Sequence, residues 1–416
     1  MPIFALTSPA VTSRLCPVRV SAYTAVSALG AGKPAHLDAV IHGRSGLSPL
    51  GRHDFGVAPL AQTLDTWVGL VQGLEDPLPD PWRHWDCRNN RLAWRGLQSD
   101  GFMNTVRRAT ERHGAHRVGL VLGTSTASIG ATEDAYQQLA QCGEFPPQPD
   151  NPALHTLHSL TGFVQEALGL RGPAQTISTA CSSSAKAFAS AERLMRLGLA
   201  DAVVVGGVDS LCGSVVFGFH ALQLVSTEPC RPFDTQRRGI NIGEAAAFAL
   251  LERAPDGLQL LGCGESSDAH HLSAPDPGGQ GTQAALDMAL SRAGLPASAI
   301  GYIHLHGTAT PQNDDVEARL IARCFEPGTP ASATKSMTGH TLGAAGALGA
   351  VFGLLALEHG ILPGTTNTTS VEPGMRAYLR VEPSRARVRH VVSNSFAFGG
   401  SNCVLVFGHG AGNRHP

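Results

Sequence analysis

The sequence predicts an α/β protein built from two similar halves. Three observations lead to this prediction: strand-like apolar runs alternate with helical stretches, two helices rich in small residues resemble each other, and charged residues are scarce. Only 15% of the 416 residues are charged, against about 25% in ordinary globular domains. A chain of this length with so few charges buries a large core, which excludes a disordered protein.

Strand-like and helical segments alternate along the chain, which indicates helices that cover sheets. Strands are expected at Arg117–Gly123, Ala174–Ser178, Ala202–Gly206, Ala245–Leu251, Leu258–Gly262, Ile300–Leu305 and Asn402–Phe407. Helices are expected at Lys33–His42, Cys181–Leu197, Gly279–Ala293, Asp315–Cys324 and Thr341–Glu358. Two Pro-containing segments, Pro77–Pro81 and Gly143–Pro152, predict surface loops, and Gly408–Pro416 predicts a frayed tail.

Two segments in different parts of the chain resemble each other. Thr179–Lys186 (TACSSSAK) and Thr338–Ala345 (TGHTLGAA) each introduce a helix that is rich in small residues and apolar on nearly all faces. A helix of that kind is buried, so the pattern is consistent with a duplicated fold whose halves meet at one site. Two alanine-rich core helices also look alike by composition alone, and the repeat leaves both interpretations open.

Composition also bears on partners and location. The net charge of −2 argues against nucleic-acid binding, for which a basic surplus is typical. No run of 18 apolar residues predicts a membrane span. The nine cysteines, an odd number without a Cys-x-x-Cys pair, indicate reduced thiols in a cytoplasm. The pairs His304/His306 and His270/His271 lack a third ligand at suitable spacing, so no metal site is expected.

Cys181 is the candidate nucleophile. It lies between the strand-like run Ala174–Ser178 and the helix that follows. A thiol at a helix N-terminus feels the positive end of the helix dipole, which predicts a lowered pKa and a larger thiolate fraction. The unpaired N–H groups of the first helical turn can also bind an oxyanion. The alternative is a buried, inert cysteine, which is the commoner fate of this residue type.

Two histidines and a lysine complete the candidate site. His306 follows a strand-like run and opens a His-Gly-Thr-Ala-Thr turn, and His340 stands at the start of the second buried helix. The dipole of that helix favours a neutral imidazole, which can donate an N–H to a developing oxyanion. Lys335, five residues before His340, can orient the site. Taken singly, each histidine is more often structural, and a lysine is usually solvated.

Four motifs together resemble the elongating β-ketoacyl-acyl carrier protein synthases, which are condensing enzymes of fatty-acid and polyketide synthesis. The motifs are Thr179–Cys181 (TAC), His306–Thr310 (HGTAT), Lys335–His340 (KSMTGH) and Asn394–Asn402 (NSFAFGGSN). The resemblance covers nearly the whole chain. Initiating condensing enzymes and thiolases share the fold but carry an asparagine or a second cysteine where the elongating class has its second histidine.

The resemblance implies a thiolase-like fold of two duplicated α/β halves in five layers, αβαβα. It places an N-terminal half with Cys181 at 17–254 and a C-terminal half with His306, Lys335 and His340 at 255–410. The implied reaction is a decarboxylative Claisen condensation of an acyl thioester on Cys181 with malonyl-acyl carrier protein. The product, β-ketoacyl-acyl carrier protein, belongs to fatty-acid synthesis or to specialised polyketide or polyene synthesis.

The resemblance also implies roles for individual residues. Cys181 takes the acyl group, His306 and His340 stabilise the enolate, and Lys335 fixes His340 and its surroundings. The backbone N–H groups of Cys181 and Phe398 form the oxyanion hole. The substrate-binding residues are expected to be Thr308 and Thr310 on the phosphopantetheine arm, Phe398 as a gate, and Phe219 and Thr126 along the acyl pocket.

Partners follow from the same resemblance. Acyl carrier protein delivers the phosphopantetheine, so no cofactor or metal of the enzyme's own is expected. We expect a homodimer, with a heterodimer that includes a chain-length-factor-like subunit as the alternative.

Two alternative functions fit this sequence pattern less well. A non-catalytic chain-length-factor-like subunit usually lacks the nucleophile that Cys181 supplies here, and a thiolase-like acyltransferase needs a second catalytic cysteine. Gly349 departs from the pattern, because many members carry a glutamate there, and Thr126 stands where an apolar residue often lines the acyl pocket. Thr126 favours an acyl chain different from a plain saturated one, and the departures together favour a specialised pathway.

Overall fold

The computed structural model describes residues 17–51, 64–145 and 152–410, and the described chain is built around one continuous path of ten strands. The path runs β6-β5-β7-β9-β1-β10-β16-β15-β11-β12. Its N-terminal strands are β1 (Val18–Ser27), β5 (Val118–Gly123), β6 (Ala174–Ile177), β7 (Ala202–Asp209) and β9 (Ala245–Arg253). Its C-terminal strands are β10 (Leu258–Ser267), β11 (Tyr302–His304), β12 (Ala331–Ser332), β15 (His390–Ala397) and β16 (Ser401–His409).

The two sets of five strands have the same connectivity. Counted in chain order, each set is arranged third, second, fourth, fifth, first. In both, the second, third and fourth strands are parallel, and the fifth is antiparallel to its two neighbours. The sets join only where β1 pairs with β10, through Val18 with Leu260 and Arg19 with Gln259. This repeated topology favours duplication over chance similarity of two helices.

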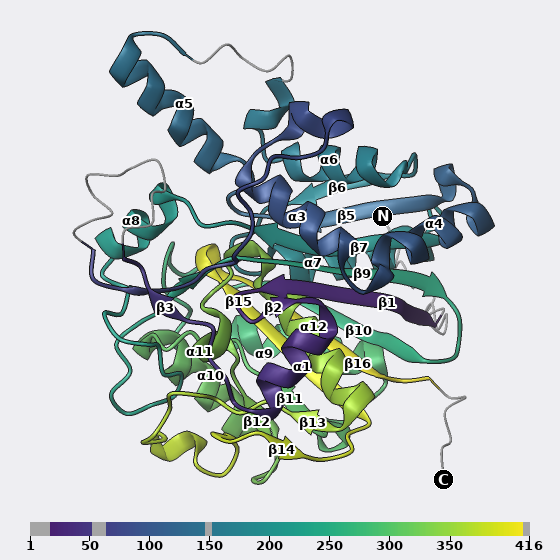
Figure 1. Ribbon diagram of the computed structural model, residues 1–416. Coiled ribbons are helices and arrows are strands. Elements are labelled where there is room, and N and C mark those ends of the chain that lie inside the picture. Colours follow the sequence, from purple (N-terminus) through teal and green to yellow (C-terminus); the bar gives the residue numbers. More distant parts are fainter. Residues whose placement is uncertain (1–16, 52–63, 146–151, 411–416) are drawn as a thin grey trace, which may run out of the picture.

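Each set of five strands forms one sheet layer. Helices form three further layers, one between the two sheet layers and one on the outer side of each, as the thiolase-like prediction requires. The middle layer consists of α7 (Ser183–Arg196) and α12 (Ala345–His359), which contact strands of both halves and each other. The outer layer on the N-terminal sheet consists of α3 (Arg88–Gln98), α4 (Phe102–His113) and α6 (Ser159–Leu168). The outer layer on the C-terminal sheet consists of α9 (Gln280–Ala293) and α10 (Pro311–Cys324). In Figure 1 the N-terminal half lies above the C-terminal half.

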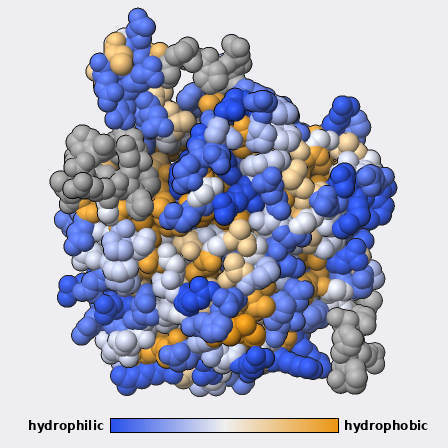
Figure 2. Space-filling model, viewed as in Figure 1, coloured by the Kyte–Doolittle hydropathy of each residue, from blue (hydrophilic) through white to orange (hydrophobic). Residues whose placement is uncertain are grey.

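The remaining elements flank this core. The helices are α1 (Gly32–Ile41), α5 (Ile129–Cys142), α8 (Gly213–Ala221) and the short α11 (Lys335–Thr338). The short strands are β2 (Gly30–Ala31), β3 (Ser48–Pro49), β4 (Trp67–Gly69), β8 (Ile242–Gly243), β13 (Ile361–Leu362) and β14 (Ser384–Arg385). Figure 1 shows α5 reaching away from the body of the molecule, and Figure 2 shows that polar residues cover most of it, with a few apolar ones between them.

The middle layer explains why two helices of the sequence are rich in small residues. A Cβ at Gly346 of α12 would lie 2.5 Å from the backbone nitrogen of Ala185 in α7, so the two helices approach too closely for any side chain there. The stretch Leu342–His359 is long and apolar enough to cross a membrane, but 83% of it is buried inside the protein. It is a core helix, and its composition follows from burial on all sides.

Element boundaries differ from the predictions mainly at helix starts. The helix expected from Cys181 begins at Ser183, and the one expected over Thr341–Glu358 is a 3-10 turn (Leu342–Ala344) followed by α12. The predicted frayed tail begins too early, because its first two residues pair with β10 and extend β16 to His409. Residues 146–151 of the predicted loop and 411–416 of the tail lie outside the described residues.

Candidate active site

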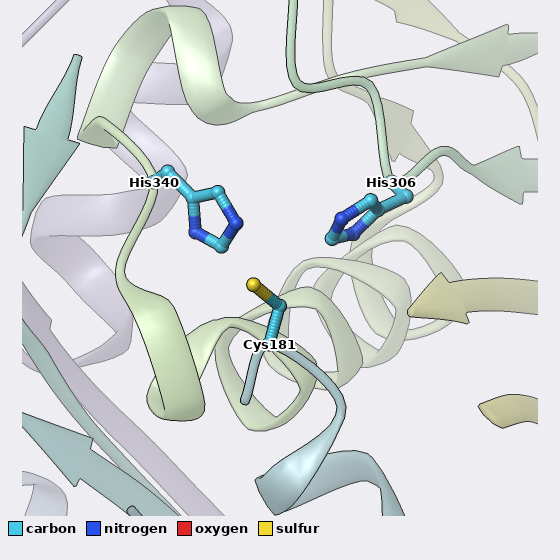
Figure 3. Close-up of side chains that lie close together, drawn as sticks. All are labelled: Cys181, His306 and His340. Atoms are coloured by element: carbon cyan, nitrogen blue, oxygen red, sulfur yellow. The ribbon is translucent and has the colours of Figure 1, made fainter. Parts of the chain in front are cut away.

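Three side chains from three separate segments converge where the two halves meet. Cys181 comes just before α7, His306 just after β11, and His340 just after α11. One ligand atom from each of the three residues lies within 4.8 Å of the other two, and Figure 3 shows the side chains pointing toward one another. All three residues are buried. The structure therefore brings together the three residues that carry the sequence motifs.

A strained turn presents the Cys181 thiol. Ala180, immediately before it, has a φ of 50°, in the left-handed region that non-glycine residues rarely adopt. Such strain is often found at functional sites. The N–H groups of Cys181 and Phe398 both lower the thiol's pKa by hydrogen bonding. Two backbone donors from distant parts of the chain thus converge on one sulfur.

The prediction of a lowered pKa for Cys181 is wrong. The pKa is raised to about 11, and the largest cause is burial, which outweighs the favourable charge of Lys335 and the two backbone donors. The helix dipole favours the thiolate, but burial removes the water that would solvate the charge, and this loss raises the pKa of the thiol by more. At neutral pH Cys181 is therefore a thiol, and it must give up its proton to become a nucleophile.

Alkylation of Cys181 by iodoacetamide tests this correction. Because the thiolate fraction of a thiol rises about tenfold per pH unit below its pKa, alkylation should keep accelerating from about pH 7 to about pH 9. Peptide mapping must follow the reaction, since the exposed Cys142 reacts as well. A rate that is already flat above about pH 7 would show a lowered pKa instead.

Both imidazoles are held neutral with a defined tautomer. Burial is the main cause that lowers the pKa values of His306 and His340 well below the ordinary range, and the charge of Lys335 adds to it. The N–H of Leu342 donates to His340 Nδ1 at 3.0 Å, and Lys335 Nζ lies 3.3 Å from His306 Nδ1. Each Nδ1 is thus the acceptor, which leaves the proton on Nε2. The site therefore offers two neutral Nε2–H donors.

Lys335 is buried and bonded to the segment that carries His306. Its Nζ donates to the carbonyl oxygen of His306 as well as to the ring. Burial lowers its pKa, and the nearby Glu317 carboxylate acts in the opposite direction. The resemblance has the lysine fix His340 and its surroundings, whereas the side-chain hydrogen bonds of Lys335 in the structure go to His306.

Three carboxylates that the sequence analysis gave no role hold the backbone around the site. Glu317 accepts the N–H groups of His306 and Gly307, each at 2.8 Å, and Asp314 accepts those of Thr308 and Ala309. Their three-residue spacing on α10 is the signal that could have identified them. The third is Asp209, whose signal was weaker because its partners lie far away in sequence.

Asp209 ties two loops together. Its carboxylate accepts N–H and O–H groups from all three residues of Thr124–Thr126 and the N–H of Gly343, which follows His340 by three residues. Thr126 is buried with its hydroxyl on this carboxylate. It is not among the residues that line the cavity at Cys181. Its predicted place in an acyl pocket therefore stays a prediction.

A cavity leads to Cys181 between the predicted substrate-binding residues. It is lined by Cys181, His306, His340, Thr308, Thr310, Phe219 and Phe398, among others. The Phe219 and Phe398 rings stack at its wall, with centroids 5.5 Å apart and planes at 29°. Thr308 and Thr310 share a hydrogen bond of 2.8 Å between their hydroxyls. Of the predicted site residues, all but Thr126 and Lys335 line this one cavity.

Comparison with known proteins gives the same family throughout. The family described as beta-ketoacyl synthase, N-terminal domain, matches residues 89–257, and its C-terminal domain matches residues 259–369. A 3-oxoacyl-[acyl-carrier-protein] synthase 2 of Coxiella burnetii is 31% identical over 92% of this chain and 95% of its own. The mitochondrial synthase of Arabidopsis thaliana is 35% identical over 72% of this chain and 70% of its own.

Solved structures agree. A ketosynthase from Xenorhabdus doucetiae, solved in complex with its chain length factor, has a TM-score of 0.87 and 35% identity, and the match covers 95% of this chain and 99% of that one. A beta-ketoacyl synthase from Burkholderia phymatum has a TM-score of 0.83 and 28% identity, over 94% of this chain and 99% of that one.

Proposed function

Because the chain belongs to the β-ketoacyl synthase family, we propose that it joins an acyl group held on Cys181 to the two-carbon unit of malonyl-acyl carrier protein. The observation that carries the proposal is the meeting of one thiol with two Nε2–H donors in a buried cavity. This set supplies a nucleophile and donors for a developing oxyanion.

The first half-reaction loads Cys181. The Cys181 sulfur attacks the carbonyl carbon of an acyl thioester while its proton passes to the carrier's sulfur. The acyl group moves to the sulfur, and the carrier's thiol leaves with a proton. The N–H groups of Cys181 and Phe398 stabilise the tetrahedral oxyanion, and their hydrogen bonds to the thiol support that role.

The second half-reaction makes the carbon–carbon bond. When malonyl-acyl carrier protein loses carbon dioxide, the electron pair of the broken bond forms an enolate on the thioester, and the Nε2–H groups of His306 and His340 stabilise its oxygen. The enolate carbon attacks the acyl carbonyl, and the bond to sulfur breaks. Burial excludes water, which would protonate the enolate.

The cavity residues are proposed to bind the substrate as the resemblance implies. Thr308 and Thr310 present hydroxyls to the phosphopantetheine arm, and the stacked Phe219 and Phe398 gate the acyl chain. We propose that the partner's phosphopantetheine is the group required and that Cys181, His306 and His340 hold no metal. Backbone N–H groups and the Lys335 charge around the sulfur favour an anion there, not a cation.

We place the two functional halves at 17–254 and 255–410. We also propose that the protein is cytoplasmic, because the eight cysteines in the described part of the chain are unpaired.

Partners in addition to acyl carrier protein are proposed from the unpaired surfaces of the N-terminal half. In the described chain β6 ends the sheet with one edge unpaired, which is a template for pairing with another chain. In the same half, α5 has no buried residue and exposes Ile129 and Tyr136. We propose that a second copy, or a chain-length-factor-like subunit, covers this region.

Tyr136→Asp should weaken that assembly. Tyr136 is 60% exposed, and a buried aromatic at an interface contributes about 2 kcal/mol or more, so the dissociation constant should rise about 30-fold. Mass photometry across a dilution series measures it. Leu197→Asp, which alters a 69% exposed leucine at the end of α7, is the matched control. Equal dimer fractions for the two variants would contradict the proposed interface.

We propose a place in fatty-acid synthesis or in specialised polyketide or polyene synthesis, as the resemblance implies. The reaction itself is tested by incubating the protein with acyl- and malonyl-acyl carrier protein and measuring β-ketoacyl product and carbon dioxide. Product formed without carbon dioxide, or carrier recovered unchanged, would contradict the proposal.

A further inference from the structure

His304 is a buried titratable group that the proposed mechanism does not use. It is the last residue of β11, two positions before His306, and it is 4% exposed. Its Nδ1 has no hydrogen-bond partner among the residues that the structure describes. A buried polar atom without a partner is rare in folded proteins and calls for an explanation.

The His304 ring fits a slot on α12 that a glycine creates. A Cβ at Gly349 would lie 3.0 Å from Cε1 and Nδ1 of the ring, and equally close to the Ser393 hydroxyl, nearer than a Cβ normally approaches other heavy atoms. One turn further along α12, Phe352 stacks on the same ring, with planes at 9° and centroids 5.9 Å apart. Residues three apart lie on one face of a helix, so Gly349 and Phe352 together enclose the imidazole.

The other edge of the ring reaches the segment that carries Lys335. His304 Nε2 lies 2.9 Å from the hydroxyl of Thr334, the residue directly before Lys335. Lys335 in turn bonds back to the carbonyl of His306. The strand end that carries His306 and the turn that carries Lys335 are therefore linked twice, once through each of these side chains.

We infer that His304 is a positioning residue for His306 and Lys335, and that position 349 is a glycine because the His304 ring occupies the space beside it. The inference rests on the proposed function of the neighbouring site. Burial and the nearby Lys335 charge lower the pKa of His304 to about 3. Its ring is therefore neutral, and it holds the segments around it in place without adding a charge to the site.

The positioning role is tested by comparing the two half-reactions. His304→Ala should slow malonyl-acyl carrier protein decarboxylation about 10- to 100-fold, because small displacements of catalytic groups cost this much. Acylation of Cys181, followed by intact mass, should change less than about threefold. His304→Gln, whose amide nitrogen reaches about as far as Nε2, should recover most of the decarboxylation rate. Equal losses in both half-reactions without recovery by glutamine would overturn the inference.

His36→Ala is the matched control for this comparison. His36 is also buried, and the centroid of its ring lies 5.9 Å from that of Phe352. Its hydrogen bonds go to Ser27 and Gly32, which do not line the cavity. Its loss should act on both half-reactions by the same factor. A selective loss of decarboxylation in His36→Ala would overturn the special role of His304.

A second measurement does not depend on activity. Alanine normally stabilises a helix interior relative to glycine, so a lower melting temperature of Gly349→Ala would report the clash with the ring. The change should lower the melting temperature more in the wild-type background than in the His304→Ala background, where the Ser393 hydroxyl alone still faces the added Cβ. Gly353→Ala, whose Cβ would face Val391 instead, should have the same effect in both.

The two measurements separate the possible failures. Additive effects of Gly349→Ala and His304→Ala on melting would overturn the space-filling part of the inference, whatever the enzyme does. Wild-type protein that fails to decarboxylate malonyl-acyl carrier protein would contradict the proposed function and, with it, the positioning role.

Discussion

Cys181→Ala should abolish acyl-enzyme formation, with a loss of at least about 10³-fold in condensation, because no other group in the cavity can carry the acyl chain. Intact mass after incubation with acyl-acyl carrier protein should show no added acyl mass. Cys181→Gln should retain malonyl decarboxylation, since both Nε2–H donors stay in place. The two variants together separate the nucleophile from the enolate-stabilising groups.

A second cysteine provides the control for this result. Cys87 is 5% exposed, like Cys181, and burial raises its pKa to about 12, but it does not line the cavity. Cys87→Ala should acylate and condense like the wild type. A Cys181→Ala protein that still gains an acyl group and condenses would contradict the assignment of the nucleophile.

His340→Ala should have the second largest effect. It removes one of the two Nε2–H donors, and loss of a single oxyanion donor typically costs about 10²- to 10³-fold. Malonyl decarboxylation should fall by that factor, whereas Cys181 acylation should fall less than about tenfold, because the backbone N–H groups of Cys181 and Phe398 that serve that step remain in place. A His340→Ala protein with an unchanged decarboxylation rate would contradict the donor role.

The pH dependence of decarboxylation has a definite sign. Both imidazole pKa values lie well below the ordinary value of about 6.5. The neutral form persists as the pH falls, so the rate should not drop between about pH 8 and about pH 6. A rate that falls with an apparent pKa near 6.5 would show an ordinary histidine in the reactive role.

The order of the motifs predicted the fold and the site residues more completely than it predicted the pKa values in the site. The five layers and the convergence of Cys181, His306 and His340 are what the resemblance carried by the four motifs implies, and the structure has both. The raised pKa of Cys181 does not follow, since the sequence displays a helix end but not how far that end lies from water.

Other features of the site depend on contacts between distant segments. The six groups that meet on Asp209 come from two loops that are separated by more than 200 residues. The pairing of His304 with Gly349 likewise joins β11 to α12. Each of these residues is ordinary in its own segment, and only the folded arrangement shows what it faces.

The most direct test of the account is a single-turnover chase. Wild-type protein loaded with one acyl group, confirmed by intact mass as an adduct on Cys181, is mixed with isotopically labelled malonyl-acyl carrier protein. The account predicts that the adduct disappears at the rate at which carbon dioxide and a β-ketoacyl-acyl carrier protein two carbons longer appear. An adduct that persists while carbon dioxide is released, or a product that forms with the adduct intact, would contradict it.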